Sequence, residues 1–127
     1  MNPTLKMAAS VALALSVVGC ATSNNLYRWG GYEDNLYAAY KDPTRAEALR
    51  IKLEAHIQET EKAGLKVAPG LYAELGTLYM QAGSQRKAID YYALERKAWP
   101  ESNQLMTAMI QNLERREGAK QTREAAR

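Results

Sequence analysis

The spacing of aromatic, leucine and small residues between Tyr72 and Pro100 constrains this sequence more than any other feature. Large side chains recur there at three- and four-residue steps, as they do along the buried face of a helix. Gly76 and Ala88 are small enough to let two helix backbones approach closely. The stretch therefore predicts a helix–turn–helix unit, and the positions that define it are Tyr72, Leu75, Gly76, Tyr79, Ala88, Tyr92 and Pro100.

These positions resemble the tetratricopeptide repeat, a helix–turn–helix unit of about 34 residues. Tyr72 takes the place of the tryptophan in that pattern, and Tyr92 takes the place of the phenylalanine. No second copy precedes this one, because the corresponding positions hold Glu54 and Gln58 where a small and an aromatic residue are needed. Since one repeat is normally too small to be stable, flanking helices or a partner must complete its core.

Two amphipathic segments flank the repeat. Thr44 and Glu47 have the spacing of a capping box, at the start of a helix that we expect to end near Ala63. On the other side, we expect Ser102 to cap a helix that continues to Glu117 and buries one apolar stripe. The sequence thus predicts an all-α fold, a short antiparallel helical array built on a single tetratricopeptide-like repeat with flanking helices.

The residues at the helix ends predict the bounds of the repeat and of the domain. Pro69 is expected to open the first repeat helix and Gly83 to end it, while Ser84 caps the second and Pro100 stops it. With the flanking helices, the predicted domain covers residues 32–117. Residues 118–127 contain no large apolar side chain, which predicts a disordered tail.

The first nineteen residues have the composition of a secretory signal peptide. Lys6 supplies positive charge, and the apolar run that follows is too short for a permanent membrane span. Gly19 and Cys20 resemble the end of a bacterial lipobox, which implies cleavage after Gly19 and a covalent lipid on Cys20. The alternatives are an ordinary signal peptide with an incidental cysteine, or an N-terminal membrane anchor.

Lipidation at Cys20 would make residues 20–31 a lipidated N-terminus and tether. By resemblance to the sorting rule of enteric bacteria, Ala21 after the cysteine implies the outer membrane, with the protein on its periplasmic face. The net charge of +3 is small and spread along the chain, so the sequence does not favour a nucleic-acid partner. The membrane, reached through the lipid anchor, is the first expected partner.

A block of aromatic residues follows the tether. The paired glycines before Tyr32 indicate a turn, and apolar residues then recur at helical spacing, which predicts a short helix over residues 32–41. The aromatic side chains could belong to the core or to a surface that binds a partner or rests among lipid headgroups. The residues concerned are Tyr27, Trp29, Tyr32, Tyr37 and Tyr40.

The first helix of the repeat offers a second candidate binding surface. Tetratricopeptide domains bind peptides or proteins along this helix, and here the corresponding face carries Ala73, Thr77, Met80 and Gln81. Ala73 and Thr77 stand where the members that clamp a terminal carboxylate have lysine and asparagine, so a helix or another subunit is the better partner. The same four residues could instead pack under the preceding helix.

Residue patterns typical of catalysis or metal binding do not occur in the sequence. There is no Ser-His-Asp or Cys-His set, no phosphate-binding glycine loop and no zinc spacing. His56 is the single histidine, and we expect it to be a surface or flanking residue without a metal. The expected protein is not an enzyme, takes no small-molecule substrate and needs no cofactor beyond the lipid on Cys20.

The lipobox, the aromatic block with Leu26, Arg28 and Leu36, and the single repeat together resemble a family of small lipoproteins of Gram-negative bacteria. Genes of that family lie beside that of a lipoprotein resembling the curli secretion channel. The resemblance implies an accessory subunit of an outer-membrane assembly that binds this protein partner. The alternatives are a regulator of a cell-wall synthase, disfavoured by a tether of only about 17 Å, and a structural protein of the membrane surface.

Overall fold

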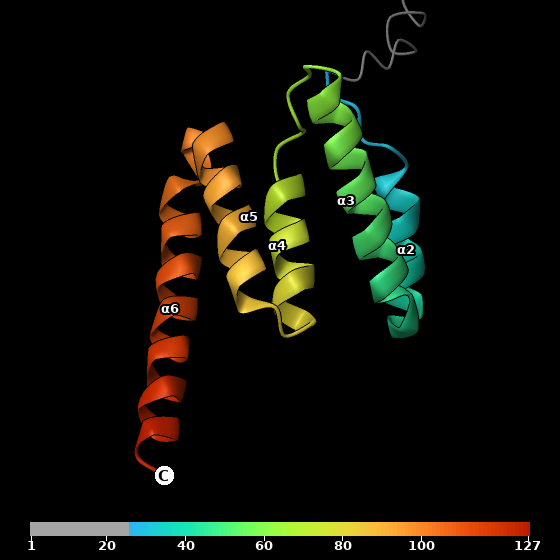
Figure 1. Ribbon diagram of the computed structural model, residues 1–127. Helices are drawn as coiled ribbons and strands as arrows, with labels where there is room; N and C mark the ends of the chain where they lie inside the picture. The colour runs from blue at the N-terminus through green and yellow to red at the C-terminus, as the bar shows by residue number, and fades with distance from the viewer. Residues whose placement is uncertain (1–25) are drawn as a thin grey trace, which may run out of the picture.

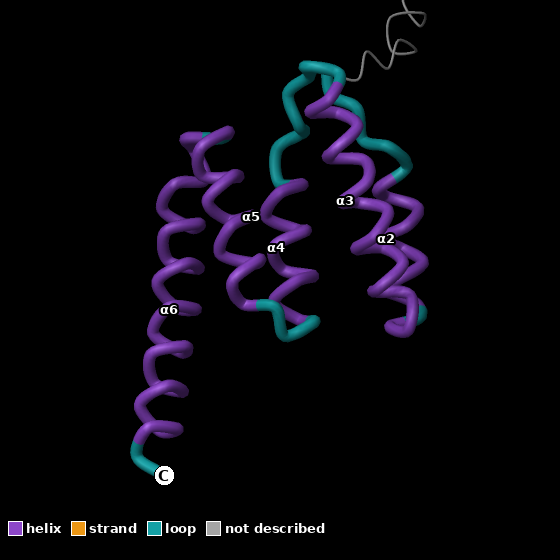
Figure 2. Tube along the Cα trace, in the orientation of Figure 1, coloured by secondary structure: helices purple, strands orange, loops and turns teal. Residues whose placement is uncertain are grey.

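The fold is an all-α helical array. The computed structural model describes residues 26–127, so the predictions for the signal peptide, Gly19 and Cys20 lie outside the described residues. The described part contains helices α2 to α6 and two short 3-10 helices, η2 and η3, without a strand (Figures 1 and 2). Their bounds are Tyr32–Lys41 (α2), Pro43–Arg45 (η2), Ala46–Lys62 (α3), Leu71–Gln81 (α4), Gln85–Ala98 (α5), Pro100–Ser102 (η3) and Asn103–Ala125 (α6).

Successive helices run antiparallel, and α3 to α6 lie side by side in chain order (Figure 1). The most extensive contact joins α4 to α5, while α6 packs on α5, α3 packs on α4, and α2 packs on α3. None of the described helices combines the length and the apolar character that crossing a membrane requires. The α4–α5 hairpin is therefore the centre of the array, with one helix against each of its sides.

The helix–turn–helix pattern coincides with this central hairpin. Tyr72, Leu75, Tyr79, Ala88 and Tyr92 are all buried, and the ring of Tyr92 is 1% exposed. Gly76 lies so close to α5 that a Cβ atom there would come within 2.8 Å of the Tyr92 ring and 3.1 Å of the Ala88 carbonyl oxygen. Pro100 is exposed and begins η3, directly after α5 ends. The small residues thus serve the close approach that their spacing predicts.

Two of the predicted helix starts lie too early in the chain. The first repeat helix begins at Leu71, after Gly70 with φ 87°, instead of at Pro69. The helix expected from Thr44 begins at Ala46, because a 3-10 turn precedes it. The predicted capping box does not form: Asp42 Oδ1 accepts hydrogen bonds from the backbone NH of Thr44 at 3.1 Å and from its hydroxyl at 2.6 Å.

The two serines predicted as caps also have other roles. Neither the Ser84 hydroxyl nor the Ser102 hydroxyl accepts a hydrogen bond from the helix that follows it. The hydroxyl of Ser102 instead donates backward, to the carbonyl oxygen of Trp99 at 2.7 Å. This bond lies within η3 and the residue before it, so it holds the corner between α5 and α6.

The predicted disordered tail is wrong. Helix α6 continues through Gly118 to Ala125 and extends past the ends of the other helices (Figure 1). Its last turns are exposed and contain mostly alanine, arginine, lysine, glutamate and glutamine, which favour helix without any tertiary contact. A pair between Lys120 and Glu124, 4.0 Å apart, adds weakly to this local stability.

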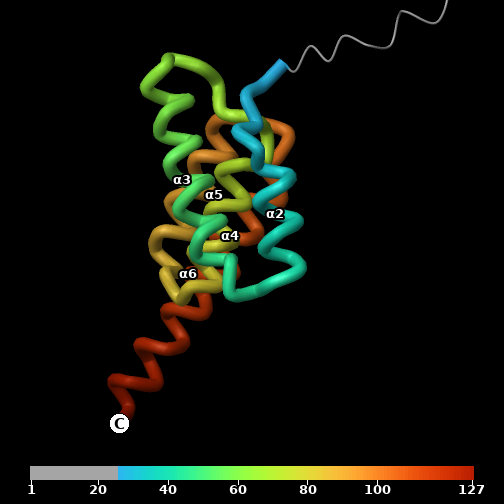
Figure 3. Tube along the Cα trace, turned by 90° about the vertical axis from the view of Figure 1, so that its right-hand side faces the viewer, coloured from blue at the N-terminus to red at the C-terminus, as the bar shows by residue number. Residues whose placement is uncertain are grey.

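The array has two distinct ends. Residues 26–31, which we call the strap, lie at one end together with the α3–α4 loop and the α5–α6 corner (Figures 1 and 3). The turns between α2 and α3 and between α4 and α5 lie at the opposite end, and α6 projects beyond them. We refer to these as the strap end and the far end.

We expect Gly76→Ala to destabilise the protein although alanine is the better helix former. The added methyl group must displace Tyr92, and overpacking of this kind costs about 1–3 kcal/mol of unfolding free energy. Gly118→Ala is the matched control, because nothing lies within 4 Å of its new methyl group; it should stabilise by up to about 1 kcal/mol. Urea unfolding followed by circular dichroism measures both changes, and effects of the same sign would contradict the close-packing interpretation.

Candidate functional site

The structure divides the aromatic block into two groups. Tyr27, Trp29 and Tyr32 are partly buried and pack against the hydrophobic core. Tyr37 and Tyr40 lie on the outer side of α2, with exposed fractions of 61% and 84%. The core interpretation therefore fits the first three residues and the surface interpretation fits the last two.

The strap joins two parts of the chain that are far apart in sequence. The ring of Tyr27 meets the ring of Trp99 edge to face, with 5.4 Å between centroids. The strap also contacts α3, where His56 Nε2 donates a hydrogen bond to the carbonyl oxygen of Arg28 at 2.8 Å. The strap is thereby attached to α3 and to the α5–α6 corner. Sequence reasoning missed this role of His56, because its partner is 28 residues away and is a backbone carbonyl.

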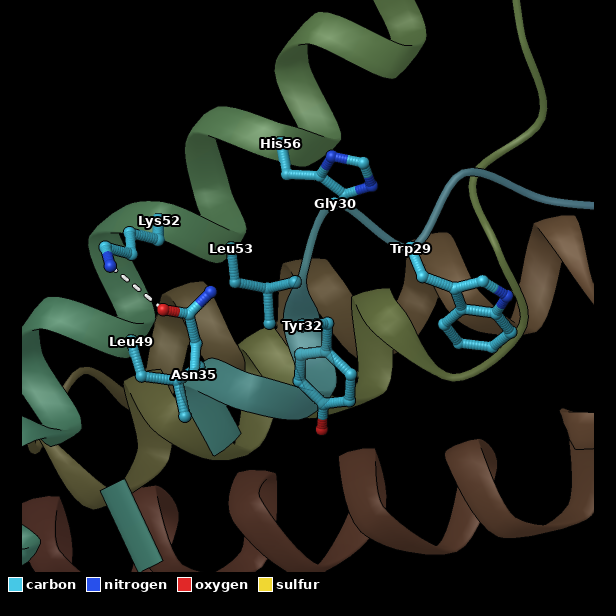
Figure 4. A pocket seen from close by; sticks show the side chains of 8 residues that line it. All are labelled: Trp29, Gly30, Tyr32, Asn35, Leu49, Lys52, Leu53 and His56. Atoms are coloured by element: carbon cyan, nitrogen blue, oxygen red, sulfur yellow. Dashed lines mark hydrogen bonds between the residues drawn. The ribbon is translucent and has the colours of Figure 1, made fainter. Parts of the chain in front are cut away.

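A very small pocket lies where the strap and α2 meet α3 (Figure 4). Its volume is about 10 Å³, which is roughly the space of one water molecule. Asn35 and Lys52 are hydrogen-bonded at its edge at 2.9 Å. This region is a packing interface that holds α2 in place, and its lining residues are Trp29, Gly30, Tyr32, Asn35, Leu49, Lys52, Leu53 and His56.

A hydrogen-bonded cluster of tyrosines and glutamates connects α3 to the repeat. Glu54 accepts hydrogen bonds from the hydroxyls of Tyr79 at 2.8 Å and Tyr91 at 3.1 Å, and these two rings stack in parallel. Tyr72 donates to Glu61 at 2.6 Å. Burial and these carboxylates raise the pKa of Tyr72 and of Tyr91. The cluster fixes α3 against the hairpin, so we assign it a structural role.

Tyr32 of α2 lies next to Glu74 of α4. Burial raises the pKa of Tyr32 to about 12, and the neighbouring Glu74 carboxylate contributes to the rise. Burial likewise raises the pKa of Glu74. Both side chains are half-buried, so Tyr32 is less available to a partner than Tyr37 and Tyr40 are.

Most of the candidate face on α4 is used inside the fold. Ala73 and Met80 pack against the core. The Thr77 hydroxyl lies 3.0 Å from the Tyr92 hydroxyl and bonds the Ala73 carbonyl oxygen at the same distance. Gln81 is exposed at the end of α4. Of this predicted binding set, Gln81 is the residue that the fold leaves open to a partner.

The exposed aromatic residues and Gln81 belong to the same end of the molecule. Gln81 lines a shallow hollow of about 290 Å³ together with residues of η2, the start of α3 and the end of α4. Helix α2, which carries Tyr37 and Tyr40, is followed directly in the chain by η2, which lines this hollow. We define the far-end surface as these exposed side chains of α2 and the hollow; it comprises Leu36, Tyr37, Tyr40, Pro43, Thr44, Ala46, Glu47, Arg50, Leu78, Gln81 and Ala82.

The chemistry of the far-end surface suits contact with another macromolecule. Tyrosine rings supply rigid contact area with one polar atom each, and they are enriched at protein interfaces. Lys41 lies 4.6 Å from the centroid of the Tyr37 ring, and Glu47 pairs with Arg50 beside the hollow. Among residues 26–127, no cluster of histidine, cysteine and acidic side chains is placed to hold a metal ion.

The strap packing can be tested with two neighbouring glycines that both have positive φ. Gly30→Ala and Gly31→Ala should each lower the free energy of unfolding by about 1 kcal/mol, because alanine is strained in a left-handed backbone conformation. Only Gly30→Ala should lower the free energy of unfolding further, because its methyl group would lie 2.3 Å from His56 Nδ1. The nearest atom to the corresponding methyl group at Gly31 is 3.8 Å away. Urea unfolding measures the difference, and the extra loss should disappear when Gly30→Ala is combined with His56→Ala. Equal losses for the two single variants would contradict this packing.

Comparison with known proteins gives one match. The family model described as "Domain of unknown function (DUF4810)" matches residues 26–109, which extend from the strap into the first part of α6. No curated protein matches the chain, and no solved structure does. The matched region includes both the strap and the far-end surface, and it covers more than half of the 127 residues. The chain therefore belongs to the DUF4810 family.

Proposed function

We propose that this protein is an outer-membrane lipoprotein of the periplasmic face that binds a protein partner through the far-end surface. The observation that carries the proposal is the exposed apolar edge of α2. Leu36, Tyr37 and Tyr40 are exposed, while the opposite side of the same helix packs on α3. An aromatic cluster of this kind on a short helix is typical of protein interfaces.

The size of the surface indicates what kind of partner would bind it. A stable interface buries about 800 Å² on each side, which is more than three side chains of one helix can supply. The partner would therefore also have to cover the hollow beside Gln81. A helix or a folded subunit can do both, with apolar residues on Tyr37 and Tyr40 and polar groups over the pair of Glu47 and Arg50.

The lipid anchor is supported by the sequence around Cys20. Gly19 and Cys20 resemble the end of a lipobox, and the described fold begins only six residues after Cys20. Each buried acyl CH₂ contributes about 0.8 kcal/mol, so a cysteine that carries several chains is stably attached to a bilayer. The resemblance to lipoproteins encoded beside a curli-secretion-channel-like lipoprotein makes that protein the proposed partner, and this protein its assembly accessory.

The anchor is tested by Cys20→Ala. The variant should lose incorporation of labelled palmitate and should move from the membrane fraction to the soluble fraction, because the acyl chains have no other attachment site. Ala21→Ser, which leaves the cysteine unchanged, is the control and should remain labelled. Unchanged labelling of Cys20→Ala would refute the lipoprotein assignment.

The partner surface is tested by site-specific crosslinking in cells. A photoreactive phenylalanine analogue in place of Tyr40 should form an adduct with the partner, and mass spectrometry then identifies it. The same analogue in place of Gln111, an exposed residue of α6, is the control and should form none. In addition, Tyr40→Ala should lower recovery of the partner about tenfold, whereas Leu105→Ala, also exposed, should not.

The identity of the adduct separates the proposed partner from its alternatives. A secretion-channel-like lipoprotein would support the assembly role, and a penicillin-binding protein would instead support regulation of a cell-wall synthase. Adducts of equal yield from the positions of Tyr40 and Gln111, or none from either, would contradict a partner at the far-end surface.

A further inference from the structure

We propose that the strap end rests on the surface of the membrane, with Leu26 and Leu65 among the lipid headgroups. This inference depends on the lipid anchor of the proposed function. The surface concerned is formed by the strap and the α3–α4 loop, at the end of the array that is opposite to the far-end surface (Figure 3). Its occupant is a bilayer that contains anionic lipid.

The length of the tether limits how far this end can be from the bilayer. Leu26 follows Cys20 by six residues, and a fully extended chain of that length spans at most about 20 Å. Leu26 itself is 90% exposed at the outer end of the strap. A lipidated Cys20 would therefore hold the strap end close to the headgroups, and no part of the described fold is nearer to the anchor along the chain.

Side-chain contacts fix the loop beside the strap, so that the two act as one surface. Tyr27 packs on Trp99, and Lys66 Nζ lies 3.5 Å from the centroid of the same Trp99 ring. Leu26 and Leu65 are the residues that precede Tyr27 and Lys66, respectively, and Leu65 is 47% exposed. Each of these two exposed leucines is thus next in sequence to a residue that contacts the buried Trp99 ring.

The charges around the two leucines suit a headgroup region. Arg28, Lys62, Lys66 and Lys97 are exposed at this end, as are the acidic residues Glu59, Glu61 and Glu101. The excess of positive charge is small, so apolar contact and the tether would supply most of the attachment, with anionic lipid adding to it. Basic side chains next to tryptophan and leucine are typical of proteins at membrane–water interfaces.

Contact at the strap end would determine which surface faces the periplasm. The far-end surface lies at the other end of the helices, and α6 projects past it (Figure 1). Helix α6 has 23 residues, which corresponds to about 35 Å at 1.5 Å per residue. The far-end surface would then point away from the bilayer, where a partner could reach Tyr40.

The two tryptophans of the chain allow a direct test. Trp29 belongs to the strap and Trp99 contacts it through Tyr27, so tryptophan emission, excited selectively over that of the tyrosines, reports on the strap end. The lipidated full-length protein is reconstituted into vesicles of phosphatidylethanolamine and phosphatidylglycerol, with and without bromine on the upper acyl carbons. We expect a loss of tryptophan emission in the brominated vesicles.

Two variants separate contact at this end from simple proximity of the anchor. Leu65→Asp should largely restore the emission, since a charge would move the loop away from the acyl boundary. Tyr40→Asp changes a side chain at the far end that is more exposed than Leu65, and this variant should be quenched like the unchanged protein. Circular dichroism confirms that both variants are folded before they are compared, and Leu26→Asp replaces Leu65→Asp if the latter is not.

The outcomes distinguish this inference from the proposed function. If mass spectrometry shows the lipid on Cys20 and bromine does not quench, or quenches the Leu65→Asp and Tyr40→Asp variants equally, the membrane contact is refuted and the lipoprotein assignment stands. If Cys20 carries no lipid in cells, both are refuted. Retained quenching with Tyr40→Asp and reduced quenching with Leu65→Asp supports the contact whatever partner binds at the far end.

Discussion

The close approach of α4 and α5 at Gly76 is the contact on which the rest of the structure depends. Without a side chain at that position, the Tyr92 ring and the Ala88 backbone lie directly against α4. The two helices are further joined where buried Glu95 of α5 accepts a hydrogen bond from the backbone NH of Gly70 at 2.8 Å, just before α4. Helix α3 packs on one member of this pair and α6 on the other, so both take their positions from it.

The strap adds a second constraint that a linear array of helices would lack. It contacts α3 through His56 and the α5–α6 corner through Trp99, which are distant from one another in sequence. These contacts give the first described residues a defined place on the fold. If the chain is attached to a membrane through its N-terminus, these contacts would limit how the whole domain is oriented relative to its anchor.

The two ends of the array carry different chemistry, and this difference organises the functional proposals. The strap end combines leucine, tryptophan and lysine near the proposed anchor, whereas the far end exposes tyrosines beside a shallow hollow. Between them, the tyrosine–glutamate cluster of Glu54, Tyr79 and Tyr91 ties α3 to the hairpin. The proposed arrangement has one end for the membrane and one for a partner, separated by the length of the helices.

The sequence by itself determined the all-α fold and the central hairpin, because helical periodicity and small residues are local signals. It also predicted α2 with the bounds that the structure shows, Tyr32–Lys41. Helix starts were less predictable, since Asp42 and Thr44 both offer oxygen atoms and the backbone geometry decides which one caps. Hydrophobic periodicity does not predict the helix beyond Gly118, because this part of α6 has no apolar face and depends on local helix propensity alone.

Only the tertiary structure decided which aromatic residues are buried. Tyr32 and Tyr37 both lie on α2, and their different exposure follows from where α3 and α4 are placed around that helix. His56 could not be assigned from its neighbours in sequence, because its hydrogen bond goes to a carbonyl oxygen 28 residues earlier. Local pattern thus determines the helices, whereas burial depends on partners distant in sequence.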